Sequence, residues 1–167
     1  MTSAYVGLGA NLGEPAAQLR TALEAIRQLP ETRVVAVSRF YRSAPMGPPE
    51  QPDYCNAVCE VDSTLAPRAL LEALIAIERA VGRIRGAERW GPRRLDLDLL
   101  HVEGVVMDEP GLHLPHPGIG QRNFVLVPLA ELAPTLEIPG LGRVADRARD
   151  SGTDGLSLWD ALEAPLA

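Results

Sequence analysis

The order in which apolar side chains recur with period two and with helical period restricts the fold of this chain more than any other feature. Segments typical of strands occur four times, over residues 4–9, 33–41, 54–62 and within RRLDLDLLHV at 93–102. Two segments with helical spacing interrupt them, at 15–29 and 67–82, and each begins with a proline. The sequence therefore predicts the element order βαββαβ.

This order is typical of the ferredoxin-like α+β fold, an antiparallel sheet with helices on one face. The chain has 167 residues, enough for one domain. We expect the domain at 1–142, with 143–167 as an acidic C-terminal extension of the same domain. The remaining segments are a proline-rich loop, a Pro/Gly/His loop, and a helix or mixed segment, at 43–53, 104–120 and 121–132 respectively.

The cationic side chains are all arginine, because the chain contains no lysine. This excludes a Walker-type phosphate loop and a lysine Schiff base. A formal net charge of −6 argues against a protein that binds nucleic acid through bulk charge. No apolar run is long enough to span a bilayer and the N-terminus carries no signal pattern, so we expect a cytoplasmic protein.

Two aspartates, Asp96 and Asp98, share one face of the last predicted strand, and leucines alternate with them. Aspartate is depleted in strands, so the pair needs an explanation. Their α-carbons are about 6.6–7 Å apart in an extended strand. Two divalent ions fit between such carboxylates, as in phosphoryl-transfer sites. A solvated face of an edge strand explains the spacing equally well.

An arginine-rich loop, GRIRGAERWGPRR at 82–94, precedes the aspartates. Arginine binds phosphate oxygens through paired donors. A glycine-containing loop of this kind beside two carboxylates indicates a lid over a metal-bound polyphosphate, although an ordinary surface loop is the alternative. Trp90 either covers an aromatic ring or anchors the loop to the body. The cationic candidates are Arg83, Arg85, Arg89, Arg93 and Arg94.

The stretch GLGANLG at 7–13 resembles the glycine-rich dinucleotide-binding motif, but Leu12 occupies a position where that motif requires glycine. We expect its glycines to form the strand-to-helix turn and Asn11 to hydrogen-bond locally. Two histidines, His113 and His116, lie in HLPHP. Proline on both sides of His116 favours an extended backbone in which the two histidines diverge, which disfavours zinc. A phosphate donor and a structural histidine both remain open.

Aromatic and amide side chains point to a planar ligand. In the strand at 54–62, Cys55 and Cys59 share the apolar face, so Tyr54 and Asn56 face the other way. Two rings can enclose a heterocycle, and an amide both donates and accepts along its edge. Phe124 is a candidate for the second ring. The two cysteines are too far apart on a strand for a disulfide.

Taken together, YVGLGANLG, FYRSAPMGPPEQPDYCNAV, RWGPRRLDLDLL and LPHPGIGQRNFVLVPL resemble the 6-hydroxymethyl-7,8-dihydropterin pyrophosphokinases of folate biosynthesis. The resemblance covers about residues 4–142. It implies that Asp96 and Asp98 hold two Mg²⁺ ions, with ATP as co-substrate. The pterin hydroxyl then attacks the β-phosphorus in line, AMP leaves, and the pterin methyl diphosphate forms. Positioning and charge neutralisation supply most of the catalysis.

The resemblance also implies roles for individual side chains. Around the pterin, Tyr54 and Phe124 enclose the ring, and Asn56 reads its pyrimidine edge together with the backbone near Ser43 and Met46. Around the phosphates, Arg83 and Arg93 bind or trigger closure of the loop that carries Trp90, and His116 and Arg122 bind the triphosphate. The remaining candidates near ATP are Glu78, Arg85 and the backbone around Leu99 and Leu100.

Three other classes compete with this interpretation. A ferredoxin-like nucleic-acid-binding domain requires a basic sheet face with clustered aromatics, and the sequence predicts neither. A metal-dependent nuclease requires further carboxylates near the metals, whereas the flanking loop offers arginine. A non-catalytic metal–nucleotide-binding module is the alternative, and the sequence disfavours it only through the completeness of the motif set. We expect a monomeric enzyme that acts on small molecules and binds neither nucleic acid nor membranes.

Overall fold

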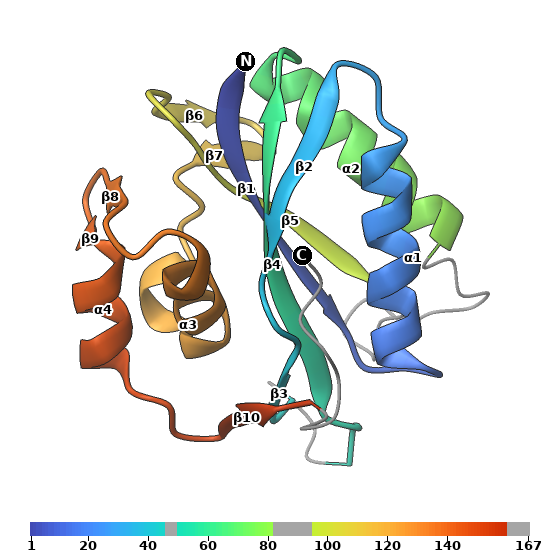
Figure 1. Ribbon diagram of the computed structural model, residues 1–167, viewed down its shortest axis with the longest axis vertical. Helices are drawn as coiled ribbons and strands as arrows, with labels where there is room; N and C mark the ends of the chain where they lie inside the picture. Colours follow the sequence, from blue (N-terminus) through green and yellow to red (C-terminus); the bar gives the residue numbers. More distant parts are fainter. Residues whose placement is uncertain (46–49, 82–94, 160–167) are drawn as a thin grey trace.

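The centre of the molecule is an antiparallel sheet of six strands (Figure 1). The computed structural model describes residues 1–45, 50–81 and 95–159. The longest pairing joins β1 (Thr2–Ala10) to β4 (Tyr54–Ser63), and β5 (Asp96–Val102) lies on the other side of β1.

Three shorter strands complete the sheet beyond β4. Both β2 (Thr32–Val37) and β3 (Tyr41–Ser43) pair with β4, one after the other along its length. The C-terminal strand β10 (Leu156–Leu158) pairs with the outer edge of β3. The order β10-β3-β4-β1-β5, with β2 also on β4, places the first and third predicted strands at the centre. This confirms the predicted ferredoxin-like arrangement.

One face of the sheet is covered by α1 (Pro15–Arg27) and α2 (Pro67–Val81). The predicted apolar stripes of both helices are buried there, with Leu19, Leu23 and Ile26 fully enclosed. Alternate residues of β1 and β4 face these helices, including both cysteines. The helices of the βαββαβ core therefore lie on one face, as predicted.

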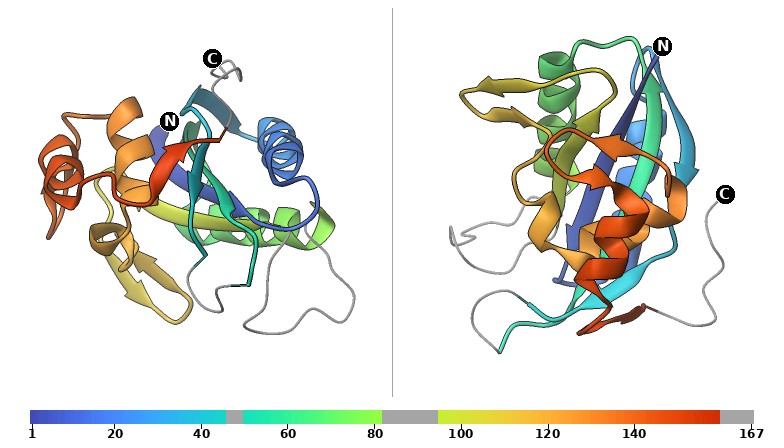
Figure 2. Two further views of the ribbon diagram at one scale, coloured as in Figure 1. Left: turned by 90° about the horizontal axis from the view of Figure 1, so that it is seen from below. Right: turned by 90° about the vertical axis from the view of Figure 1, so that its left-hand side faces the viewer.

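The opposite face is covered by the C-terminal third of the chain, which the βαββαβ pattern does not include. Both α3 (Asn123–Leu132) and α4 (Val144–Ser151) lie on this side, and Figure 2 shows the sheet between the two helix pairs. A second apolar cluster forms here from Val58, Leu100 and the inner side of α3. The predicted helix or mixed segment at 121–132 is thus a short 3₁₀ turn followed by a helix.

Smaller elements connect these layers. One hairpin consists of β6 (Met107–Glu109) and β7 (Leu112–Leu114), and the 3₁₀ turn η1 (Ile119–Gln121) follows it. A second hairpin consists of β8 (Glu137–Ile138) and β9 (Gly142–Arg143). Among the helices that the structure describes, none is long and apolar enough to cross a membrane.

The single strand predicted over 33–41 is wrong, because the chain forms two strands with a break at Ser38. The Ser38 N–H donates to the Val58 carbonyl, but the Ser38 hydroxyl, not its carbonyl, accepts from the Val58 N–H at 3.0 Å. The side chain therefore replaces the backbone in the ladder. β-Branched content predicts extended backbone, but it does not reveal this exchange of acceptors.

The alternation of β5 is interrupted by a bulge, which the apolar run Leu99–Leu100 conceals in the sequence. Leu99 pairs with Val6, and His101 pairs with Tyr5, so that Leu100 is the extra residue. The bulge turns His101 toward the second face, where it stacks on Tyr5 with ring centroids 6.3 Å apart. His101 is buried, and its Nδ1 has no hydrogen-bond partner among the described residues.

Replacing His101 with phenylalanine is expected to reduce the acid sensitivity of folding. Burial lowers the pKa of His101, against the opposing charge of Glu103, while Tyr5 stays neutral because its pKa is raised to about 12. Below about pH 6.5 the unfolded chain binds a proton that the native imidazole does not bind, so stability falls as pH decreases toward the native pKa. Urea unfolding at about pH 7.5 and about pH 5.5 measures this loss. An equal loss in wild type and variant would contradict the assignment.

Candidate active site

A cavity opens on the second face of the sheet where β1 carries glycine instead of a side chain. Gly7 and Gly9 lie on the face opposite to the buried Val6 and Leu8, and both line the cavity. A Cβ on Gly9 would lie 3.3 Å from the Oδ1 of Asn56. The absence of side chains at these two positions therefore leaves room for a ligand against the sheet.

These glycines correct one prediction. They belong to β1 and not to the strand-to-helix turn, where Gly13 has a positive φ of 62°. Asn11 also makes contacts far along the chain: its Nδ2 donates to the Oε1 of Gln51 at 3.2 Å and to the carbonyl of Pro52 at 3.1 Å. The buried Asn11 thus holds the segment that leads into β4. The strand predicted over residues 4–9 already contains both glycines, and β1 confirms that strand.

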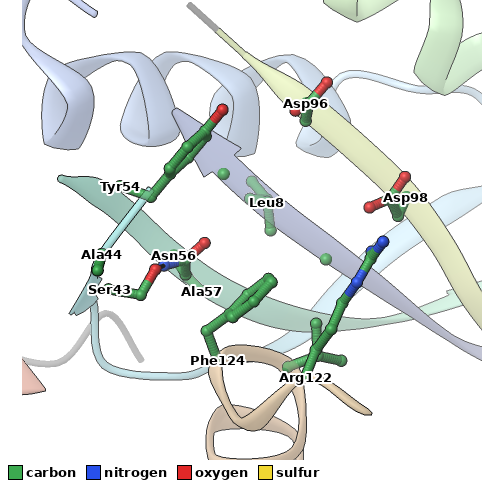
Figure 3. Close-up of a pocket in the computed structure, with 13 residues that line it drawn as sticks. Leu8, Ser43, Ala44, Tyr54, Asn56, Ala57, Asp96, Asp98, Arg122 and Phe124 are labelled. Atoms are coloured by element: carbon green, nitrogen blue, oxygen red, sulfur yellow. Dashed lines mark hydrogen bonds between the residues drawn. The ribbon is translucent and has the colours of Figure 1, made fainter. Parts of the chain in front are cut away.

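Four predicted ligand-binding side chains surround the cavity (Figure 3). Ser43 comes from β3, Tyr54 and Asn56 from β4, and Phe124 from the start of α3. Asn56 is 4% exposed, and its Nδ2 donates to the Ser43 hydroxyl at 2.6 Å. This bond fixes the amide plane, so that the side chain presents one defined polar edge to a ligand.

The two aspartates of β5 face the same cavity. Asp96 pairs with Gly9 and Asp98 with Gly7, so both carboxylates stand beside the glycine floor. Leu95, Leu97 and Leu99 are buried on the other face. The carboxylate pair thus lines a cleft, although β5 is an edge strand of the sheet and the Asp98 side chain is 43% exposed.

Arg122 lines this cavity beside Asp98, and His116 lies close to Asp98 without lining the cavity. The His116 N–H donates to the Leu100 carbonyl at 2.7 Å, which brings its Nε2 to 3.9 Å from the Oδ1 of Asp98. The Gly118 N–H donates to His116 Nδ1 at 3.0 Å, so the neutral ring carries its proton on Nε2. Burial lowers the pKa of His116, with Asp98 opposing, which favours this neutral form. Figure 3 shows the Arg122 side chain extending toward Asp98.

A second cavity begins on the other side of Asp98. It is lined by Asp98 and His116, together with side chains and backbone of α2, β5 and the β6–β7 region: Leu71, Leu97, Leu99, Gly111, Leu112, His113 and Pro117. His113 also bonds Asp108, with 2.6 Å between its Nδ1 and the Oδ1 of the carboxylate. Asp98 is common to the two cavities, and this is the arrangement required of a group that acts between two bound molecules.

Several predicted site residues lie elsewhere. Glu78 lines neither cavity; its Oε2 accepts the N–H of Leu97 at 2.7 Å, which ties α2 to β5. The others fall outside the described residues, and they are Met46, Arg83, Arg85, Arg89, Trp90, Arg93 and Arg94. Sequence reasoning missed the residues that line the cavities mainly through backbone or small side chains: Gly7, Gly9, Ala44, Ala57, Gly111 and Pro117.

Comparison with known proteins identifies the family. The model of the 7,8-dihydro-6-hydroxymethylpterin-pyrophosphokinase family matches residues 5–134. The chain belongs to this pyrophosphokinase family. A 2-amino-4-hydroxy-6-hydroxymethyldihydropteridine pyrophosphokinase of Pseudomonas aeruginosa is 53% identical over 135 residues, which cover 81% of this chain and 83% of the relative. The pyrophosphokinase of Methylorubrum extorquens is 48% identical over 140 residues, covering 84% and 88%.

Solved structures show the same fold as this pyrophosphokinase. An HPPK-DHPS structure in complex with substrates superposes with a TM-score of 0.70 at 10% identity, covering 90% of this chain and 45% of that one. The Plasmodium falciparum HPPK-DHPS with pteroate gives the same TM-score at 11% identity, covering 89% and 44%. The present chain spans less than half the length of these structural neighbours. The resemblance seen in the sequence is thus confirmed for family and fold.

Proposed function

We infer that the two cavities hold the two substrates of a pyrophosphokinase and that Asp98 acts where they meet. The protein is an ATP-dependent pyrophosphokinase of folate biosynthesis, which transfers diphosphate from ATP to 6-hydroxymethyl-7,8-dihydropterin. The observation that carries the assignment of sites is that Asp98 lines both cavities. The glycine-floored cavity takes the pterin, and the second cavity takes the nucleotide.

In the reaction the oxygen of the pterin hydroxymethyl group forms a bond with the β-phosphorus. The bond between that phosphorus and the oxygen bridging to the α-phosphate breaks, the hydroxyl proton is lost, and AMP leaves. The attacking oxygen has to lie in line with the leaving oxygen. Two cavities that meet at one carboxylate hold the reactants on opposite sides of the transferred group, which supports positioning as the main catalytic contribution.

The donors of this corner fit magnesium. Mg²⁺ is usually held by one or two carboxylates plus substrate phosphates and water, and Asp96 and Asp98 provide such a pair. The described residues contain no group of three or more protein ligands that could hold a metal without substrate. We propose that the pair holds two Mg²⁺ ions together with ATP. When bound, the ions neutralise the charge that develops on the phosphates.

Each wall of the first cavity has a distinct role toward the pterin. Tyr54 and Phe124 enclose the ring, and each aromatic pair of this kind contributes about 0.5–1.5 kcal/mol beyond the burial of its area. The amide of Asn56, held by Ser43, reads the polar pyrimidine edge. Toward ATP, the Nε2–H of His116 and the guanidinium of Arg122 donate to phosphate oxygens, and the β5 backbone around Leu99 lines the nucleotide cavity.

The remaining proposals concern residues and properties beyond this geometry. The roles of five residues outside the described ranges remain predictions from the family resemblance, and these residues are Met46, Arg83, Arg85, Trp90 and Arg93. We propose a monomer, because both cavities are built from one chain, and a cytoplasmic location, because both cysteines are free thiols. Gel filtration at micromolar concentration tests the first, and a substantial dimer fraction would contradict it.

Replacing Gly9 with valine is expected to abolish pterin binding while ATP still binds. The new methyl groups would occupy the floor of the first cavity, since even a Cβ there approaches Asn56 to 3.3 Å. Titration of the variant with each substrate by calorimetry measures the effect, and Ala69→Val, at an exposed position of α2 on the other face of the sheet, is the control. Retained pterin affinity in Gly9→Val would place the pterin elsewhere.

The experiment that tests the proposed function identifies the products. The protein is incubated with ATP, Mg²⁺ and the dihydropterin, and the nucleotide product is analysed by chromatography. One AMP for each pterin diphosphate is expected. ADP would mean single-phosphoryl transfer, and ATP binding without turnover would favour the alternative, a non-catalytic metal–nucleotide-binding module.

A further inference from the structure

The C-terminal strand lies against the back of the first cavity, although it falls outside the match to the family model. β10 forms the outer edge of the sheet and pairs with β3 through Leu156 opposite Ser43 and Leu158 opposite Tyr41 (Figure 1). Immediately after this strand, the N–H of Trp159 donates to the carbonyl of Phe40 at 3.0 Å. The strand that carries Ser43 is therefore held on both edges, by β4 inside and by β10 outside.

Arg42 joins three segments behind the cavity wall. Its guanidinium carbon lies 4.0 Å from the centre of the Trp159 ring, and its Nη2 donates to the Trp159 carbonyl at 3.3 Å. Its Nη1 lies 3.7 Å from the Oδ2 of Asp53. The cation–π stack and the hydrogen bond to the carbonyl contribute most to fixing the Arg42 side chain, because the exposed ion pair with Asp53 is weak.

The neighbours of these contact residues are cavity residues. Arg42 precedes Ser43, Asp53 precedes Tyr54, and Ser43 and Tyr54 pair with each other across the β3–β4 ladder. Side chains alternate along a strand, so the Arg42 side chain lies on the side of β3 opposite to Ser43. A displacement of Arg42 would therefore move two lining residues of the cavity and the hydroxyl that fixes the Asn56 amide.

We propose that Arg42 and Trp159 are positioning residues for the pterin, and that β10 with its Trp159 stack holds the Ser43–Tyr54 wall in its binding geometry. The inference rests on the proposed assignment of the first cavity to the pterin. Neither residue lines that cavity, so their effect passes through the wall. The second cavity contains no residue of β3, β4 or β10, so ATP binding is independent of the stack.

The test compares Trp159→Ala with Trp159→Phe, and Arg42→Ala with Arg42→Lys, in the full-length protein. The first variant of each pair removes the stack. Phenylalanine retains a ring for the guanidinium, whereas lysine retains charge but loses the planar stack. Arg33→Ala is the matched control. Arg33 makes an exposed ion pair with Asp62, with 3.2 Å between Nη2 and Oδ2, and neither residue lines the cavity. KM for each substrate, kcat and Tm are measured for all variants.

The alanine variants are expected to raise the KM for pterin about 2- to 5-fold, the range of one partly exposed cation–π stack, since 41% of the Arg42 side chain is exposed. The KM for ATP should stay within about twofold, and Trp159→Phe should recover most of the loss. Arg42→Lys should resemble Arg42→Ala. An equal rise in both KM values, or no recovery with phenylalanine, would mean a general structural role and overturn the proposal.

A parallel Asn56→Ala variant separates this inference from the site assignment. If Asn56→Ala raises the KM for pterin and the Trp159 and Arg42 variants do not, only the positioning role fails. If Asn56→Ala leaves the KM for pterin unchanged, the assignment of the cavity fails first. If an alanine variant does not fold, Trp159→Phe and Arg42→Lys decide between the outcomes by the same ratio of the two KM values.

Discussion

Replacing Asp98 with asparagine is expected to reduce kcat on the order of 10³-fold, the loss typical when a group that stabilises transition-state charge is removed. The substitution keeps the size of the side chain and removes its charge. Asp98 lines both cavities and lies 3.9 Å from His116 Nε2, so in the proposed site its charge would act on both substrates. Asp96 lines only the first cavity, and Asp96→Asn is expected to cost less, on the order of 10²-fold.

Steady-state assays at saturating ATP and pterin measure both losses, and titration of Mg²⁺ shows whether higher metal concentration restores turnover. Asp150→Asn is the control, since Asp150 is an exposed carboxylate on α4. A kcat for Asp98→Asn within about threefold of wild type would remove the carboxylate pair from the mechanism.

Replacing Asn56 with leucine is expected to reduce kcat/KM for the pterin by about 100-fold or more. A site built to hydrogen-bond a polar edge discriminates strongly when the bond is lost, because buried polar groups of the ligand are left without partners. The substitution also removes the donor that Ser43 accepts at 2.6 Å. The affinity for ATP should not change, since Asn56 does not line the second cavity.

The comparison that supports this interpretation uses Asn123→Leu. Asn123 bonds the Asp154 carbonyl at 2.9 Å on the exposed side of the α3 start, one residue from Phe124. It tests whether loss of an amide near the same wall is harmful by itself. Thermal unfolding of both variants accompanies the kinetics. A fall in kcat/KM for Asn123→Leu as large as that for Asn56→Leu would deny Asn56 a specific role.

Local alternation predicted much of this architecture. The opposite orientation of Asn56 and Cys55 follows from the period of a strand, and the structure has it. The same period places Asp96 and Asp98 on one face, although only the structure shows that this face is a cleft. The sequence pattern decides which side chains share a face, and the sheet order decides what lies opposite to that face.

Long-range contacts account for what local patterns could not predict. The proximity of His116 to Asp98 depends on a bond from the His116 backbone to Leu100, across a turn that contains two prolines. The position of β10 is equally inaccessible, because three residues of weak pattern in an acidic tail become a strand only through pairing with β3. Both cases are set by tertiary contacts and not by propensity.

The two free thiols of β4 can react with a reagent only when the centre of the sheet opens. Cys55 and Cys59 are fully buried, and burial raises the pKa of each thiol to about 12. A thiol reagent added to the folded protein therefore reacts only with molecules in which the central strand has separated from its neighbours. The rate of thiol modification therefore measures how often β4 separates from its neighbours. The same rate, measured with substrates bound, shows how far they slow that opening.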